Sequence, residues 1–194
     1  MKTNLLENKT KAKLFTIAIL AITVATLAST TLAYFTAENT AHNVITTSGV
    51  EIEIQEWADK DKTKKFEDLS GVMPGATETK IAEVKNTGGA PAWIRVKIEK
   101  SIELKEDGEV DLDLVKLDID TTNWTEKDGW YYYNEQLPAD KVTAPIFTTV
   151  TFDTTMGNEY QNSKATVTVY AQAVQSDNNG NTVLTAQGWP ANAE

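Results

Sequence analysis

The chain has no cysteine and a single histidine, His42, among its 194 residues. Without cysteine it can form neither a disulfide framework nor a thiolate metal site, so an exported form would depend on its hydrophobic core for stability. One imidazole is too few for the usual zinc sites, and it excludes a protease helix carrying two histidines. No Gly-x-Ser-x-Gly elbow occurs either. We therefore expect a protein that is not an enzyme and that has no catalytic residue, metal or cofactor.

Basic residues are also few. The 18 lysines and arginines face 28 aspartates and glutamates, and the formal net charge is −10. Residues 1–33 carry four lysines and one glutamate, so their removal changes the net charge from −10 to −13. An acidic surface of this kind repels phosphate groups. We expect no nucleic-acid partner, and contact with a membrane only through the N-terminal segment before that segment is removed.

The N-terminal segment has the order of parts found in a secretory signal. A lysine-rich stretch precedes an uncharged apolar run over residues 14–28, and small residues follow up to Ala33. We predict a helical signal peptide over residues 1–33, cleaved between Ala33 and Tyr34, and hence a secreted protein. The alternative is an uncleaved membrane anchor, although a spanning helix needs about 20 apolar residues.

The rest of the chain is predicted to fold as one all-β domain over residues 49–194. Val50, Ile52 and Ile54 alternate with polar residues, which is typical of a strand with one buried face. Further strands are predicted at residues 78–85, 92–104, 130–133, 145–153 and 164–175, with a short last strand near Val183 and Leu184. Many short strands without a long helix indicate a jelly-roll-like antiparallel β-sandwich.

Local signals refine this prediction at four places. Pro74-Gly75 suits a type II turn, and Asp128-Gly129 predicts a hairpin. The apolar residues change parity between Leu114 and Val115, which predicts a β-bulge, with a short helix as the alternative. The run of four aromatic residues at 130–133 would place rings on both faces of its strand.

Several short motifs occur in a characteristic order along the chain. They are residues 31–36 (TLAYFT), 43–46 (NVIT), 49–54 (GVEIEI), 73–75 (MPG), 86–89 (NTGG) with 92–96 (AWIRV), 129–134 (GWYYYN) and 171–177 (AQAVQSD). This set resembles the exported proteins processed by the SipW-type signal peptidase of Firmicutes. That family includes TasA, the camelysin (CalY) proteins and biofilm pilins of the BsaA type.

The resemblance implies a jelly-roll pilin-like subunit that polymerises into a biofilm matrix or surface fibre of a Gram-positive bacterium. Its partners would be copies of itself, a SipW-type signal peptidase during export, and a minor fibre subunit. It also implies that residues 34–48 form an N-terminal extension that acts as a donor strand for the next subunit. On this chain the side chains of that polymerisation strand would be Tyr34, Phe35, Val44 and Ile45.

Donor strand complementation can be weighed against its cost. Full burial of those four side chains contributes about 6–12 kcal/mol, at about 1.5–3 kcal/mol each. Association costs about 4–15 kcal/mol, so backbone hydrogen bonds and flanking contacts must favour assembly. We expect such a subunit contact at the aromatic residues Trp124, Trp130, Tyr131, Tyr132 and Tyr133.

Three alternatives remain open. Residues 34–48 could instead pair within their own sheet and cover an edge strand. The chain could be a secreted metallopeptidase of the camelysin type, although its residues offer no evident metal site. It could also be a monomeric surface-binding module that uses the same aromatic residues.

Overall fold

The structure is a computed structural model that describes residues 35–38, 41–45, 49–67, 69–105 and 107–191. The predicted signal peptide lies outside these residues, as does the predicted cleavage site at Ala33 and Tyr34. Among the described residues, no helix is both long enough and apolar enough to cross a membrane.

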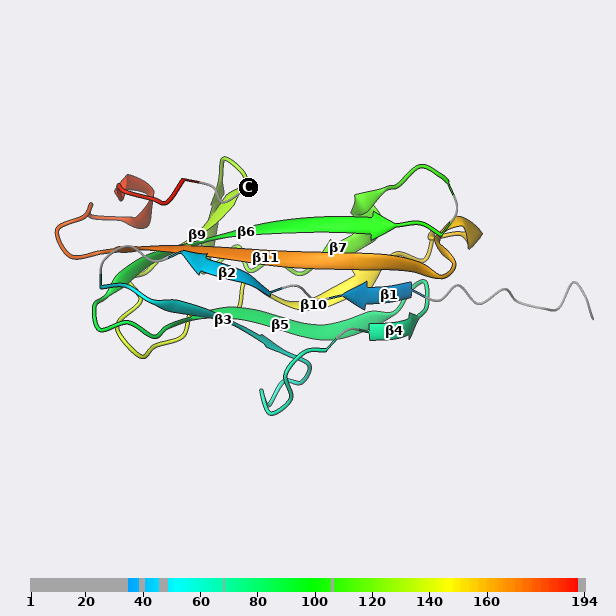
Figure 1. Cartoon of the computed structure of the whole chain (residues 1–194), viewed down its shortest axis with the longest axis horizontal. Coiled ribbons are helices and arrows are strands. Elements are labelled where there is room, and N and C mark those ends of the chain that lie inside the picture. Colours follow the sequence, from blue (N-terminus) through cyan, green and yellow to red (C-terminus); the bar gives the residue numbers. More distant parts are fainter. Residues whose placement is uncertain (1–34, 39–40, 46–48, 68, 106, 192–194) are drawn as a thin grey trace, which may run out of the picture. The chain divides into compact units, whose positions relative to one another are not determined.

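Two β-sheets make up the described part of the chain (Figure 1). The larger sheet has the order β4 (Leu69–Val72), β1 (Phe35–Glu38), β11 (Ser163–Gln175), β6 (Ala92–Glu103), β9 (Trp130–Tyr133) and β8 (Trp124–Lys127), with β2 (Ala41–Ile45) also paired to β11. The smaller sheet has the order β3 (Ile52–Trp57), β5 (Thr77–Asn86), β10 (Phe147–Phe152) and β7 (Val115–Leu117). From β3 onward the chain passes repeatedly from one sheet to the other, as in jelly rolls. The predicted all-β sandwich is confirmed.

The core lies between the sheets, and the period-2 pattern explains why it forms there. The longest antiparallel pair joins β6 to β11, with Ile94 beside Ala173 and Val96 beside Ala171, all four of which are buried. Lys100 shares the parity of these apolar residues, yet its ammonium donates to the carbonyl oxygens of Leu112 and Val115, at 2.8 and 2.9 Å. Its charge is therefore hydrogen-bonded where it enters the sandwich.

Both predicted turns are present. The Ala76 amide donates to the Met73 carbonyl at 3.0 Å, and Gly75 has a φ of +79°, as the third residue of a type II turn requires. Asp128 and Gly129 have φ values of 53° and 77°, the pair of positive values that a type I′ hairpin needs. This hairpin joins β8 to β9 in register.

Two predicted local structures are wrong. The parity change at Leu114 is not a β-bulge but the end of a short 3-10 helix, η1 (Leu112–Leu114), where the Asp111 side chain accepts a hydrogen bond from the Asp113 amide. The predicted last strand is another 3-10 helix, η3 (Val183–Thr185), with a capping box from Thr182. In both places a side chain bonds to nearby backbone and so competes with strand pairing.

Candidate strand-acceptor site

The described parts of the N-terminal segment, residues 35–38 and 41–45, lie in the larger sheet of their own chain. β1 runs parallel to β11, with Glu38 beside Thr166, and antiparallel to β4, with Phe35 beside Val72. β2 continues along β11 in the same direction, and Ile45 ends beside Gln172. This pairing within the chain is the first alternative left open by the sequence.

We call the space that the segment occupies the slot. One wall of the slot is β4, which flanks β1 only, and the other is the edge of β11 that pairs with β1 and β2. The opposite edge of β11 is paired with β6 from Lys164 to Gln175. Without a strand in the slot, the backbone amides and carbonyls along this first edge of β11 would have no ladder partner. The fold therefore needs this segment or an equivalent strand.

Three of the four predicted polymerisation residues belong to strands that lie in this slot. Phe35 belongs to β1, whereas Val44 and Ile45 belong to β2. Tyr34 lies outside the described residues. The structure thus places three of the four on strands that pair with β11.

Hydrogen bonds and burial anchor the backbone where the chain enters the smaller sheet after this segment, at Val50 and Glu51. The Glu51 carbonyl accepts hydrogen bonds from the Thr87 and Gly88 amides, at 2.8 and 3.0 Å. A Cβ at Gly88 would lie 2.6 Å from the Glu51 nitrogen, so only glycine fits this approach without a shift. Val50 is fully buried. Residues 46–49 are therefore the link between the strand in the slot and the anchored body.

The predicted aromatic contact residues are mostly inside the chain. Trp124, Trp130, Tyr132 and Tyr133 are each at most 9% exposed, and only Tyr131 is half-buried. Trp124 and Tyr133 pack together in the main core, with ring centroids 5.1 Å apart. Trp130 and Tyr132 face the other side of the sheet. The rings do lie on both faces, but four of the five are not a free surface patch.

The C-terminal segment, residues 176–191, covers the outer aromatic face, and we call it the C-terminal latch. The Arg95 guanidinium lies between two rings, 4.1 Å from the Trp130 centroid and 4.7 Å from that of Trp189. Arg95 also donates two hydrogen bonds to the Gln172 side-chain oxygen, at 2.9 and 2.7 Å. The Trp93 indole donates to a latch carbonyl, that of Asn179, at 2.8 Å. Sequence reasoning missed this arrangement, because no local pattern pairs Trp189 with a distant strand.

Buried charges form a second group that sequence reasoning missed. The Lys80 ammonium lies 2.8 Å from the Glu56 carboxylate, and both side chains are buried. Glu83 is also buried, and it accepts hydrogen bonds from the Trp57 indole and the Lys62 ammonium. The available signal was the alternation along the strand. Glu56 lies an even number of residues from the core residue Ile52, so both side chains point to the same face of β3.

Asp118 holds the end of β7 against the start of β10. Its carboxylate accepts hydrogen bonds from the amides of Thr148 and Thr149, at 2.8 and 2.6 Å. Partial burial acts to raise the pKa of Asp118, but the hydrogen bonds from both threonines outweigh it and lower that pKa below its usual value. Within the described ranges, no three histidine or acidic side chains gather in a group that could hold a metal ion.

Comparison of the chain with models of known families, with curated proteins and with solved structures found no match in any of the three.

Proposed function

We propose that this protein is a secreted structural subunit that assembles non-covalently into an extracellular fibre by strand donation between copies. The observation that carries the proposal is the slot. Strands β1 and β2, from the start of the predicted mature chain, occupy it, with β11 as a partner of both and β4 as a partner of β1. A strand held in this way can be supplied by another copy, because identical elements can exchange between copies at low cost.

Pairing within the chain and donation to a neighbour compete for the same slot. A short link gives the chain's own segment an effective concentration in the millimolar range. Dilute protein therefore keeps its own strand, whereas high local concentration favours exchange. A fibre that forms outside the cell, where subunits accumulate, follows from this balance.

Signal cleavage supplies a natural start for assembly. The first described strand begins at Phe35, two residues after the predicted cut behind Ala33. While the signal remains in the membrane, the end of the segment cannot pass between β4 and β11 of another copy. Cleavage frees that end.

Electron microscopy of two purified proteins tests the proposal. Mature protein that begins at Tyr34 should form filaments at high concentration, whereas protein that lacks residues 34–43 should not. Filaments from both proteins would contradict strand donation. A mature protein that stays monomeric at every concentration would contradict the fibre function itself.

A reversible lock provides the matched control. Glu38 and Thr166 are register partners, so Glu38→Cys with Thr166→Cys can join the segment to its own β11 by a disulfide. The oxidised protein should remain monomeric, and reduction should restore filaments. The combination Glu38→Cys with Thr79→Cys places the second thiol in the smaller sheet, on β5, and should assemble with or without reductant.

A further inference from the structure

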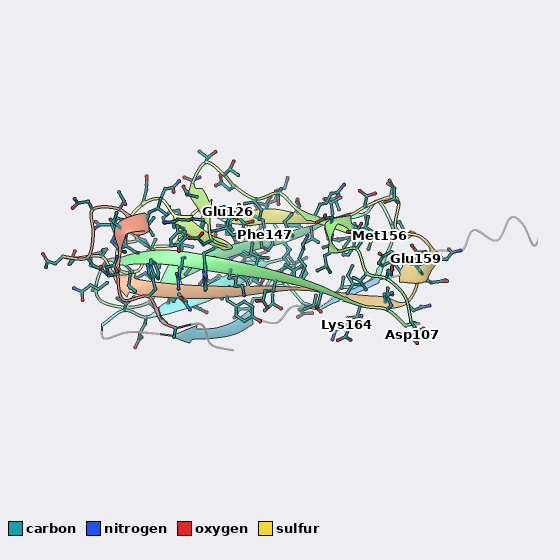
Figure 2. The ribbon with its side chains drawn as sticks, turned by 90° about the horizontal axis from the view of Figure 1, so that it is seen from above. Asp107, Glu126, Phe147, Met156, Glu159 and Lys164 are labelled. Carbon is teal, nitrogen blue, oxygen red and sulfur yellow. The ribbon has the colours of Figure 1, made fainter. Side chains whose placement is uncertain are left out.

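Both ends of the link between segment and body lie at the same end of the sandwich. Ile45, at the end of β2, lies beside Gln172, near the end of β11. Ile52, at the start of β3, pairs with Asn86, and the short loop from Asn86 leads to Ala92 beside Gln175. We call this the hinge end (Figure 1). The opposite, entry end holds Phe35 beside Ser163, and Figure 2 shows Lys164 there near Asp107 and Glu159.

The lengths of the segment and the link limit what a donated strand can do. Residues 35–45 as an extended strand span about 33 Å, at about 3.3 Å per residue. The chain from Ile45 to the anchored Val50 can reach at most about 18 Å. The link therefore cannot run the length of a sandwich. The hinge end of the donor must therefore lie close to the end of the acceptor at which the donor's Ile45 leaves the slot.

Donation in the direction seen within the chain would close a pair. If the segment ran parallel to the acceptor's β11, Ile45 would emerge at the acceptor's hinge end. The two hinge ends would then meet, and the emptied slot of the donor would open at the same junction. The acceptor's own segment would fill it, which gives a closed two-fold dimer with no free slot for growth.

Donation in the opposite direction leaves growth open. If the segment ran antiparallel to β11, Ile45 would emerge at the entry end of the acceptor. The donor's hinge end would then face the acceptor's entry end, and the donor's own slot would remain free for the next copy. Head-to-tail contacts of this kind generate filaments.

We infer that the segment reverses direction on assembly: it lies parallel to β11 within its own chain and antiparallel to β11 of the neighbouring copy in the fibre. This inference rests on the proposed fibre function. Pairing energetics favour the reversal, because parallel pairs are slightly less stable per residue than antiparallel pairs. The segment pairs with β11 through both β1 and β2 but with β4 only through β1, so more pairs become antiparallel than become parallel.

Four single substitutions distinguish the two directions. Within the chain, Glu38 lies beside Thr166 and His42 lies beside Tyr170. If the reversed segment keeps the same midpoint along β11, these partners are exchanged. Position 38 would then lie beside position 170, and position 42 beside position 166. The wrong partner in either direction is four residues away, roughly 13 Å, which is too far for a disulfide. The natural chain has no cysteine to interfere.

The experiment mixes pairs of Glu38→Cys, His42→Cys, Thr166→Cys and Tyr170→Cys proteins in the mature chain, assembles filaments, oxidises them and separates the chains by gel electrophoresis. We expect chains to be joined in the 38–170 and 42–166 mixtures and to stay separate in the 38–166 and 42–170 mixtures. As a control, one unassembled chain carrying both Glu38→Cys and Thr166→Cys should form an internal disulfide.

The outcomes separate this inference from the proposed function. Filaments whose chains are joined through 38–166 and 42–170 would overturn the reversal while the fibre function stands. Filaments with no disulfide in any mixture would also overturn it, because the segment would then not occupy the slot. A protein that forms no filaments would overturn the fibre function, and the reversal with it.

Discussion

The Lys80 ammonium and the Glu56 carboxylate lie 2.8 Å apart on neighbouring strands, with both side chains buried and the Phe66 ring 4.2 Å from the ammonium. A buried ion pair of this kind adds little stability compared with well-packed apolar residues, but the loss of one partner leaves an uncompensated charge. The pair therefore constrains which substitutions this part of the core accepts.

The first prediction concerns this pair. Lys80→Met should lower the free energy of unfolding by about 3–5 kcal/mol, because Glu56 would remain buried without its counter-charge. Lys80→Met combined with Glu56→Leu should recover most of that loss in urea denaturation. Lys97→Met, which removes one partner of the exposed pair with Glu99, should change the stability little. A double variant no more stable than Lys80→Met would contradict this prediction, because removing the Glu56 charge would then bring no recovery.

The second prediction concerns the contact that anchors the start of β3. Gly88→Ala should cost about 1–3 kcal/mol, since its Cβ would lie 2.6 Å from the Glu51 nitrogen. Gly89→Ala is the matched control, because a Cβ there has no atom within 4 Å. Thermal denaturation of both proteins measures the difference. If the two variants have the same melting temperature, the close approach to Glu51 is not a constraint on this loop.

The third prediction concerns the C-terminal latch. Trp189→Ala removes one of the two rings that flank Arg95, which should cost about 1–2 kcal/mol. Residues 176–191 should then be cut faster by a protease, whereas the main core stays protected. Leu184→Ala alters a 42% exposed latch residue and serves as the control. Unchanged cleavage of Trp189→Ala would mean that the ring does not hold the latch.

The fourth prediction concerns acid stability. The pKa of Asp118 is lower in the folded protein than the unfolded value of about 3.9, so its contribution is fully present above pH 4 and is lost as the pH falls through the folded pKa. Asp118→Asn should therefore lower stability at neutral pH and show a smaller further loss below pH 4. Urea denaturation at several pH values measures this. If the free energy of unfolding falls equally with pH in the natural protein and in Asp118→Asn, Asp118 does not have this role.

The fold could largely be predicted from the sequence, because strands with one buried face leave a period-2 pattern. Ile52 in β3 and Val96 in β6 follow that pattern, and both are buried as expected. The turn residues Gly75 and Asp128 were equally informative, since few residues adopt their backbone conformations. These signals are local, and they do not depend on which strand becomes a neighbour.

The candidate site could be predicted only in part. The family resemblance implied that Phe35 and Ile45 belong to a strand for a sheet edge, but not which strand they pair with or in which direction. The parallel register of Glu38 with Thr166 joins residues far apart in the chain, and nothing near either residue specifies it. The latch over Trp130 was missed for the same reason, because Trp189 reaches its partners only in the folded chain.

The aromatic cluster that the latch forms with the sheet also has a spectroscopic use. Three of the five tryptophans, Trp93, Trp130 and Trp189, gather on the outer face beside Ala92 and Gln175, close to where the link leaves the sandwich. Indole emission depends on the polarity and quenching groups around the ring, and here Arg95 touches two of the rings. Any subunit that docks against this end should therefore alter the intrinsic fluorescence, so that polymer growth can be followed in real time without an attached dye.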